Sequence, residues 1–107
     1  MLDTYRKPNT TDWMEIGREV LDRKEAVLAC LSDDSNARKK AAATRFFYSF
    51  VQSTYGIKQG TARQLIRNYQ RFGGSNMRAD LERAFTTSEL TILAARTDDE
   101  VASRLRH

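Results

Sequence analysis

The sequence predicts an all-α protein, a compact bundle of about five to six helices. Apolar side chains recur at helical spacing in several continuous segments, and no stretch alternates apolar and polar residues as a strand does. Three pairs of residues have the spacing of a capping box, which marks the start of a helix. At 107 residues, with one proline and five glycines, the chain has the length of a single domain and few helix breakers.

The first half of the chain predicts two long helices. Asp12 and Glu15 have the capping-box spacing, and apolar residues follow at helical intervals, so the first helix is expected over residues 12–31. A polar break at 32–36 separates it from a second helix over 37–54, which is rich in helix formers. The aromatic residues expected to anchor the core are Trp13, Phe46, Phe47 and Phe50.

The second half predicts shorter helices. Apolar residues at helical spacing indicate a helix over 61–72, ended by Gly73 and Gly74, since glycine adopts the positive φ that terminates many helices. A further short helix is expected over 76–84. Two more are expected to start at Ser88 and Asp98, behind the cap pairs Thr86 with Glu89 and Thr97 with Glu100.

The charges are segregated along the chain. Residues 35–79 contain nine basic residues and no acidic one, whereas 1–34 has five basic against eight acidic and 80–107 four against six. Solvated helix faces usually mix the two signs, so a block of one sign favours a polyanionic partner. The sequence therefore predicts that the protein binds nucleic acid.

Residues 37–72 have the pattern of a helix-turn-helix. Gly56 occupies the tight turn, and Ile57 is expected to fill the core behind it. Gln52, four residues before the glycine, stands where such motifs usually hold a small residue, which predicts wider packing between the two helices. The positions expected to be buried are Val51, Tyr55, Ile57, Ala62 and Leu65.

Burying those positions turns the other long side chains of the second helix outward. Lysine and arginine can bond guanine and glutamine can bond adenine, and the N-terminal end of a recognition helix usually meets the base edges. The residues expected to read bases are Lys58, Gln59, Thr61, Arg63, Gln64 and Arg67. Those expected to bind phosphates, which fixes the register on the duplex without reading its sequence, are Arg38, Lys39, Lys40 and Arg71.

Several features follow one another within 55–105: the turn at Gly56 and Ile57, the start of the next helix at Thr61 and Ala62, then ADLERAF and TTSELTILAARTDDEVASRL. This order resembles the central helix-turn-helix region of ParB-type partition proteins and of related plasmid and phage modules. The resemblance implies that a short helix, a Thr/Ser-capped helix and a third helix support the reading head. It also implies DNA binding through the six base-reading residues, but no clamp or CTPase activity, because no counterpart of the family's nucleotide-binding domain is present.

These observations predict a sequence-specific binder of double-stranded DNA, a repressor or an origin- or partition-site binder of a phage, plasmid or satellite element. One alternative is the N-terminal targeting domain of a larger replication initiator or nuclease. Another is a helical protein-interaction adaptor that uses the acidic first helix or the apolar residues Leu90, Ile92 and Leu93. A homodimer is expected on DNA, because one short helix contacts only a few base pairs.

The sequence offers little support for catalysis. His107 is the sole histidine and lies at the terminus, so neither histidine catalysis nor a His/Cys metal site is expected, and no cofactor is implied. Cys30 is the sole cysteine; within its apolar surroundings it is expected to be a buried small hydrophobe, and it fits a reducing, cytoplasmic compartment. No apolar stretch reaches the roughly 20 residues of a membrane span.

Overall fold

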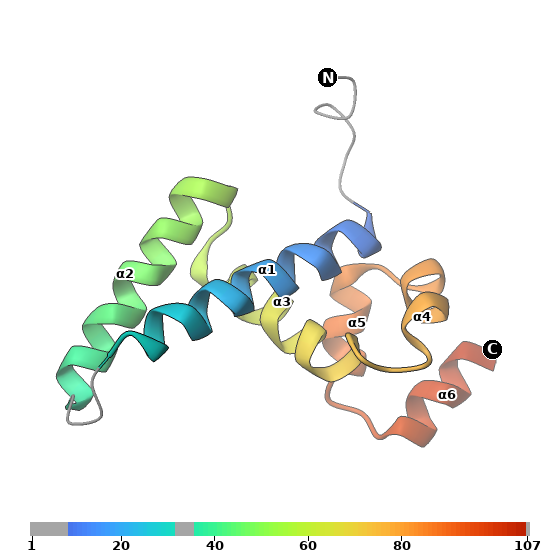
Figure 1. The fold of residues 1–107 in the computed structure, drawn as a ribbon. Helices are drawn as coiled ribbons and strands as arrows, with labels where there is room; N and C mark the ends of the chain where they lie inside the picture. Colours follow the sequence, from blue (N-terminus) through green and yellow to red (C-terminus); the bar gives the residue numbers. More distant parts are fainter. Residues whose placement is uncertain (1–8, 32–35, 107) are drawn as a thin grey trace.

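The computed structural model describes residues 9–31 and 36–106, and within these it contains six α-helices and no strand, which confirms the all-α fold. Helix α2 lies at one side of the molecule and α4, α5 and α6 gather at the other, while α1 runs across the middle, against α3 (Figure 1). The helices are α1 (Thr10–Ala29), α2 (Ala37–Tyr55), α3 (Gln59–Phe72), α4 (Arg78–Ala84), α5 (Thr87–Leu93) and α6 (Asp98–Arg106).

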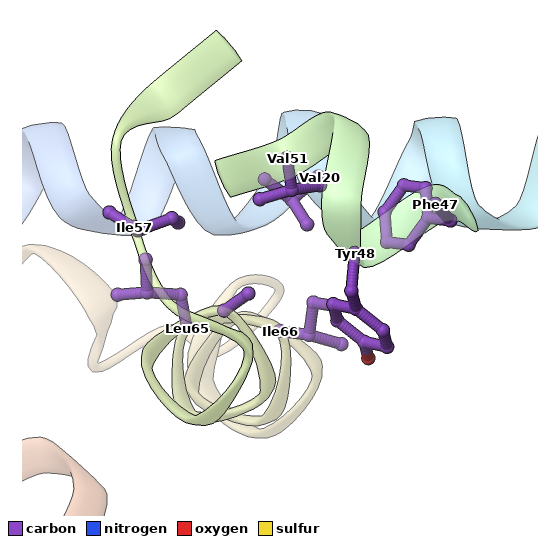
Figure 2. Close-up of a cluster of buried hydrophobic side chains, with 8 residues drawn as sticks. Val20, Phe47, Tyr48, Val51, Ile57, Leu65 and Ile66 are labelled. Atoms are coloured by element: carbon purple, nitrogen blue, oxygen red, sulfur yellow. The ribbon is translucent and has the colours of Figure 1, made fainter. Parts of the chain in front are cut away.

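Two clusters of buried hydrophobic side chains hold the helices together, and α1 and α3 contribute to both. The first lies where α1, α2 and α3 meet (Figure 2) and consists of Val20, Phe47, Tyr48, Val51, Ile57, Ala62, Leu65 and Ile66. The second joins α1 and α3 to the three short helices and consists of Met14, Phe72, Leu81, Leu90, Leu93 and Val101. Helix α3 is therefore packed on one side along its whole length.

Helix α1 crosses α3 closely at Gly17. This glycine is buried, and a Cβ atom added to it would overlap the backbone oxygen of Leu65 and lie 3.0 Å from its carbonyl carbon. A backbone atom cannot move aside as a flexible side chain can, so any larger residue would push the two helices apart. The sequence did not indicate this crossing, because the glycine interrupts neither the length nor the periodicity of the predicted helix.

The capping residues explain where the helices begin. Helix α1 starts at Thr10 rather than residue 12, because its capping box joins Asn9 to Asp12: each backbone N–H donates to the other's side chain, at 2.9 and 2.8 Å. The predicted pair of Asp12 with Glu15 is wrong. The box of Thr86 with Glu89 is confirmed at α5, and Thr97 and Glu100 make the corresponding reciprocal bonds at α6.

The turn after α3 differs from the prediction. Gly73 has φ −59°, an ordinary right-handed value, and its N–H donates to the carbonyl of Tyr69 at 2.7 Å. Gly56 alone has a positive φ among the described residues. The prediction that Gly73 and Gly74 end α3 through positive φ is therefore wrong, although the helix does end at that point.

Three residues predicted to be buried are exposed. Phe47 is 1% exposed, but its neighbours Phe46 and Phe50 are 74% and 39% exposed, so only one of the three phenylalanines anchors the core. Consecutive helical residues point about 100° apart, so Phe46 and Phe47 cannot share one buried face. Cys30, the C-cap of α1, is also exposed, so it is not the buried small hydrophobe that the sequence predicts.

Candidate nucleic-acid interface

Helices α2 and α3 are joined by a turn of three residues. Gly56 adopts φ 71° and ψ 21°, and its N–H donates to the carbonyl of Gln52 at 2.9 Å, which ends α2. Ile57 then points into the first cluster and is 8% exposed (Figure 2). The side chain of Gln52 is exposed, so it does not widen the packing between the two helices as the sequence had suggested. Tyr55, expected to be buried, is half-buried beside the cluster.

The rotation of α3 about its own axis is fixed by its buried face. Ala62 and Leu65 are buried as predicted, at 0% and 2% exposure, together with Ile66 and Phe72. Asn68, also buried, donates from Nδ2 to the hydroxyl of Thr91 at 3.1 Å, which ties α3 to α5. The opposite face of α3 must therefore point to solvent.

All six residues predicted to read bases are exposed. Gln59, Arg63, Gln64 and Arg67 point away from the buried face, whereas Lys58 and Thr61 are exposed at the start of α3. None of the six forms an ion pair or a side-chain hydrogen bond with another described residue. Gln59, Arg63 and Arg67 succeed one another at intervals of four, which aligns them along one side of the helix. The structure thus brings Arg63, Arg67 and two glutamine amides to the solvent side of α3, with Lys58 and Thr61 exposed at the start of the helix.

The N-terminus of α3 differs from those of α1, α2 and α5. Asn9, Asn36 and Thr86 cap those helices through their side chains, whereas Lys58 makes no side-chain capping bond to α3. The first backbone N–H groups of a helix have no partner within the helix and stand at the positive end of its dipole. The start of α3 therefore combines amide donors that no side chain caps with the exposed Lys58 side chain.

The structure divides the nine basic residues of 35–79 into two groups. Arg71, predicted to bind phosphate, joins α3 to α6, because its guanidinium contacts Asp98 Oδ1 at 2.7 Å and the carbonyl of Arg96 at 3.0 Å. Arg78 contacts Glu15 at 3.0 Å and Glu82 at 2.9 Å. The other seven form no ion pair with any described residue: Arg38, Lys39, Lys40, Arg45, Lys58, Arg63 and Arg67.

The ion pairs of Arg78 shift the pKa values of the groups that form them. Hydrogen bonds from Arg18 and Arg78 lower the pKa of the Glu15 carboxyl. Bonds to Glu82 and Glu15 in turn raise the pKa of the Arg78 guanidinium. These contacts link α1 to α4.

Helix α2 carries its charges at the less favourable end. Arg38, Lys39 and Lys40 occupy the first turn, all exposed, and no acidic residue accompanies them. Cations at the positive end of a helix dipole are unfavourable, and a bound anion would offset that cost. Asn36 compensates in part, because its side chain accepts the N–H of Lys39 at 2.9 Å.

Arg45 belongs to the same exposed set, although the sequence-based assignment did not include it. It lies one helical turn before Tyr48 on the same side of α2. Tyr48 is the residue whose ring Arg63 of α3 approaches, so Arg45 lies on the side of α2 that borders the exposed face of α3. The count of nine basic residues in the acid-free block was the signal that could have included it.

Three helices meet at the ring of Tyr48, which is 4% exposed. Cζ of Arg63, from α3, lies 5.5 Å from the ring centroid, and Nζ of Lys24, from α1, lies 5.6 Å from it. Lys24 Nζ also lies 3.4 Å from the tyrosine hydroxyl. Phe47 packs edge-on against the same ring, with 5.1 Å between centroids. The guanidinium of Arg63 thus lies next to a ring that its neighbours fix in place.

The structure also bears on metal binding, on membrane spans and on the apolar surface considered for an adaptor. In the part of the chain that the structure describes, no group of three or more His, Cys, Asp or Glu residues is placed to hold a metal ion, and His107 lies outside that part. No described helix has the length and apolarity needed to cross a membrane. Of the apolar residues weighed as an adaptor surface, Leu90 and Leu93 are buried and Ile92 alone is exposed.

Comparison with known proteins returned no match: no family model, no curated protein and no solved structure corresponds to this chain.

Proposed function

We propose that this protein binds double-stranded DNA in a sequence-specific manner, with α2, the Gly56 turn and α3 acting as a helix-turn-helix. One observation carries the proposal: seven basic side chains on α2, α3 and the turn between them have no acidic partner among the described residues, although Arg71 and Arg78 of the same block do. Unpaired cations concentrated on two adjoining helices favour binding of a polyanion.

In this proposal α3 is the recognition helix and enters the major groove by its N-terminal end. Gln59 and Gln64 suit adenine, while Arg63 and Arg67 suit guanine, with Lys58 and Thr61 at the leading end of the helix. The uncapped start of α3 favours a nearby phosphate.

Helix α2 would contact the DNA backbone. Arg38, Lys39 and Lys40 bind phosphates in this proposal, and Arg45 joins them because it borders α3. Arg71 is left out, since its guanidinium is held by α6.

The biological role that fits such an interface is a repressor or an origin- or partition-site binder of a phage, plasmid or satellite element, acting as a homodimer in the cytoplasm without catalytic activity. The resemblance of 55–105 to the reading head of ParB-type proteins supports this role. The same interface would equally serve the targeting domain of a larger initiator or nuclease. All of these roles require the same binding mechanism.

Selection from a random duplex library, followed by sequencing of the bound fraction, tests the proposal. We expect one enriched motif, and an affinity for that motif that falls as salt rises because bound phosphates release counterions. A variant with Arg63, Arg67 and Lys58 all changed to alanine provides the control and should lose the enrichment while keeping its helical circular dichroism. Recovery of unenriched sequences with no dependence on salt would contradict DNA binding and favour the adaptor.

A further inference from the structure

Arg63 differs from every other member of the proposed reading face. Gln59, Gln64 and Arg67 have no described side-chain partner, whereas the Arg63 guanidinium lies against the ring of Tyr48, with Cζ 5.5 Å from the centroid. That distance is within the range of a cation–π interaction. Arg63 is therefore exposed to solvent while its guanidinium rests against the Tyr48 ring.

The ring that restrains Arg63 is itself held on several sides. Tyr48 is buried in the first cluster, Phe47 packs against it edge-on, and the ammonium of Lys24 contacts its hydroxyl from α1. A side chain that is buried and bonded in this way has one orientation, so it presents a fixed surface to its neighbour. Residues from three helices thus determine where the Arg63 guanidinium lies.

We propose that Tyr48 is a positioning residue that holds Arg63 in the orientation needed to bond a base edge, and that Lys24 stabilises Tyr48 in that role. The inference rests on the DNA-binding function proposed above and assigns the origin of its specificity at one base. Two parallel hydrogen bonds to guanine require the planar guanidinium to be correctly oriented. A flexible arginine loses rotamer freedom when it binds, and an arginine already ordered loses less.

The test compares two substitutions of Tyr48 by NMR and by binding. Tyr48→Leu removes the ring and keeps an apolar side chain, whereas Tyr48→Phe keeps the ring and removes the hydroxyl that contacts Lys24. In the free protein the ring current should displace the Arg63 Nε–Hε signal from that of Arg67. We expect Tyr48→Leu to abolish this displacement and Tyr48→Phe to retain most of it.

In the binding assay, Tyr48→Leu should reduce the discrimination between bases at a single position by roughly 2- to 10-fold. That factor corresponds to the entropy lost when one flexible side chain becomes ordered on binding. That position should be the one that Arg63→Ala also affects, and the dependence of affinity on salt should not change. Tyr55→Leu is the matched control, because Tyr55 is also an α2 tyrosine beside the first cluster, but its hydroxyl donates to Glu19 of α1 and no arginine of α3 lies over its ring. It should leave every base preference intact.

The results separate this inference from the function on which it depends. Unchanged preference in a folded Tyr48→Leu variant, while the unaltered protein binds its motif, would overturn the positioning role and leave DNA binding intact. If Tyr48→Leu does not fold, the NMR signal of Arg63 in the unaltered protein decides: coincidence with that of Arg67 would overturn the inference. Absence of any duplex binding by the unaltered protein would overturn both.

Discussion

Replacing Phe47 by alanine should destabilise the protein far more than the same replacement of Phe46, its neighbour on α2. Phe47 is 1% exposed and packs against Tyr48, whereas Phe46 is 74% exposed. Replacing a fully buried phenylalanine by alanine loses its burial and leaves a cavity, which lowers the free energy of unfolding by about 3 to 5 kcal/mol. A largely solvent-exposed ring contributes about 0.5 kcal/mol or less.

The expected loss at Phe47 is a large share of the total, since a chain of this length has a free energy of unfolding on the order of 5 to 15 kcal/mol. Urea denaturation followed by circular dichroism at 222 nm measures both variants, with the slope m reporting whether the unfolded states are comparable. Equal losses of unfolding free energy for Phe46→Ala and Phe47→Ala, with unchanged m, would refute the conclusion that α2 buries the face that carries Phe47.

Four further outcomes are expected. Gly17→Ala should lower the unfolding midpoint in urea, because the added Cβ overlaps the backbone of Leu65, by about 1 to 3 kcal/mol in free energy; a neutral or stabilising effect would contradict the close crossing. The lowered pKa of Glu15 means that its folded-state contribution is present above the ordinary value of 4.5 and is lost as pH falls through the folded pKa, so Glu15→Gln should reduce stability at neutral pH and flatten its decline in acid; parallel pH curves would contradict this. Lys39→Ala should weaken cognate and random duplexes equally and reduce the salt slope by about one unit, whereas loss on the cognate duplex alone would remove Lys39 from the phosphate contacts. Sedimentation should find two chains on each cognate duplex; a strictly one-to-one complex would exclude the homodimer.

The helices could be predicted because their signals are local. Apolar spacing indicated α1 and α3, and cap residues such as Thr86 and Glu89 located the start of α5 within one residue. An error arose where two local signals competed: Asp12 can pair forward with Glu15 or back with Asn9. In the structure Asn9 caps the helix and pairs with Asp12, while Glu15 pairs with Arg18 and Arg78.

Features that depend on packing between distant segments could not be predicted. Phe46 and Phe47 are adjacent in the sequence, and only the placement of α1 and α3 decides which is buried. The ion pair of Arg71 with Asp98 depends likewise on where α6 lies. The exposure of Gln59, Arg63, Gln64 and Arg67 could be predicted, because the buried positions Ala62 and Leu65 fix the helical period. The contact of Tyr48 with Arg63 joins two helices and had no counterpart in the sequence.

Comparison of Arg63→Ala with Arg104→Ala on cognate and random duplexes tests the central claim most directly. Both residues are exposed arginines without an ion pair among the described residues, but Arg63 lies on α3 and Arg104 on α6, so each variant loses the same charge from a different surface. We predict that Arg63→Ala weakens cognate binding by roughly 1 to 3 kcal/mol and flattens the preference at one base position, and that Arg104→Ala changes neither. Equal effects of the two variants, or a uniform loss on all duplexes with Arg63→Ala, would contradict recognition of DNA bases by the exposed face of α3.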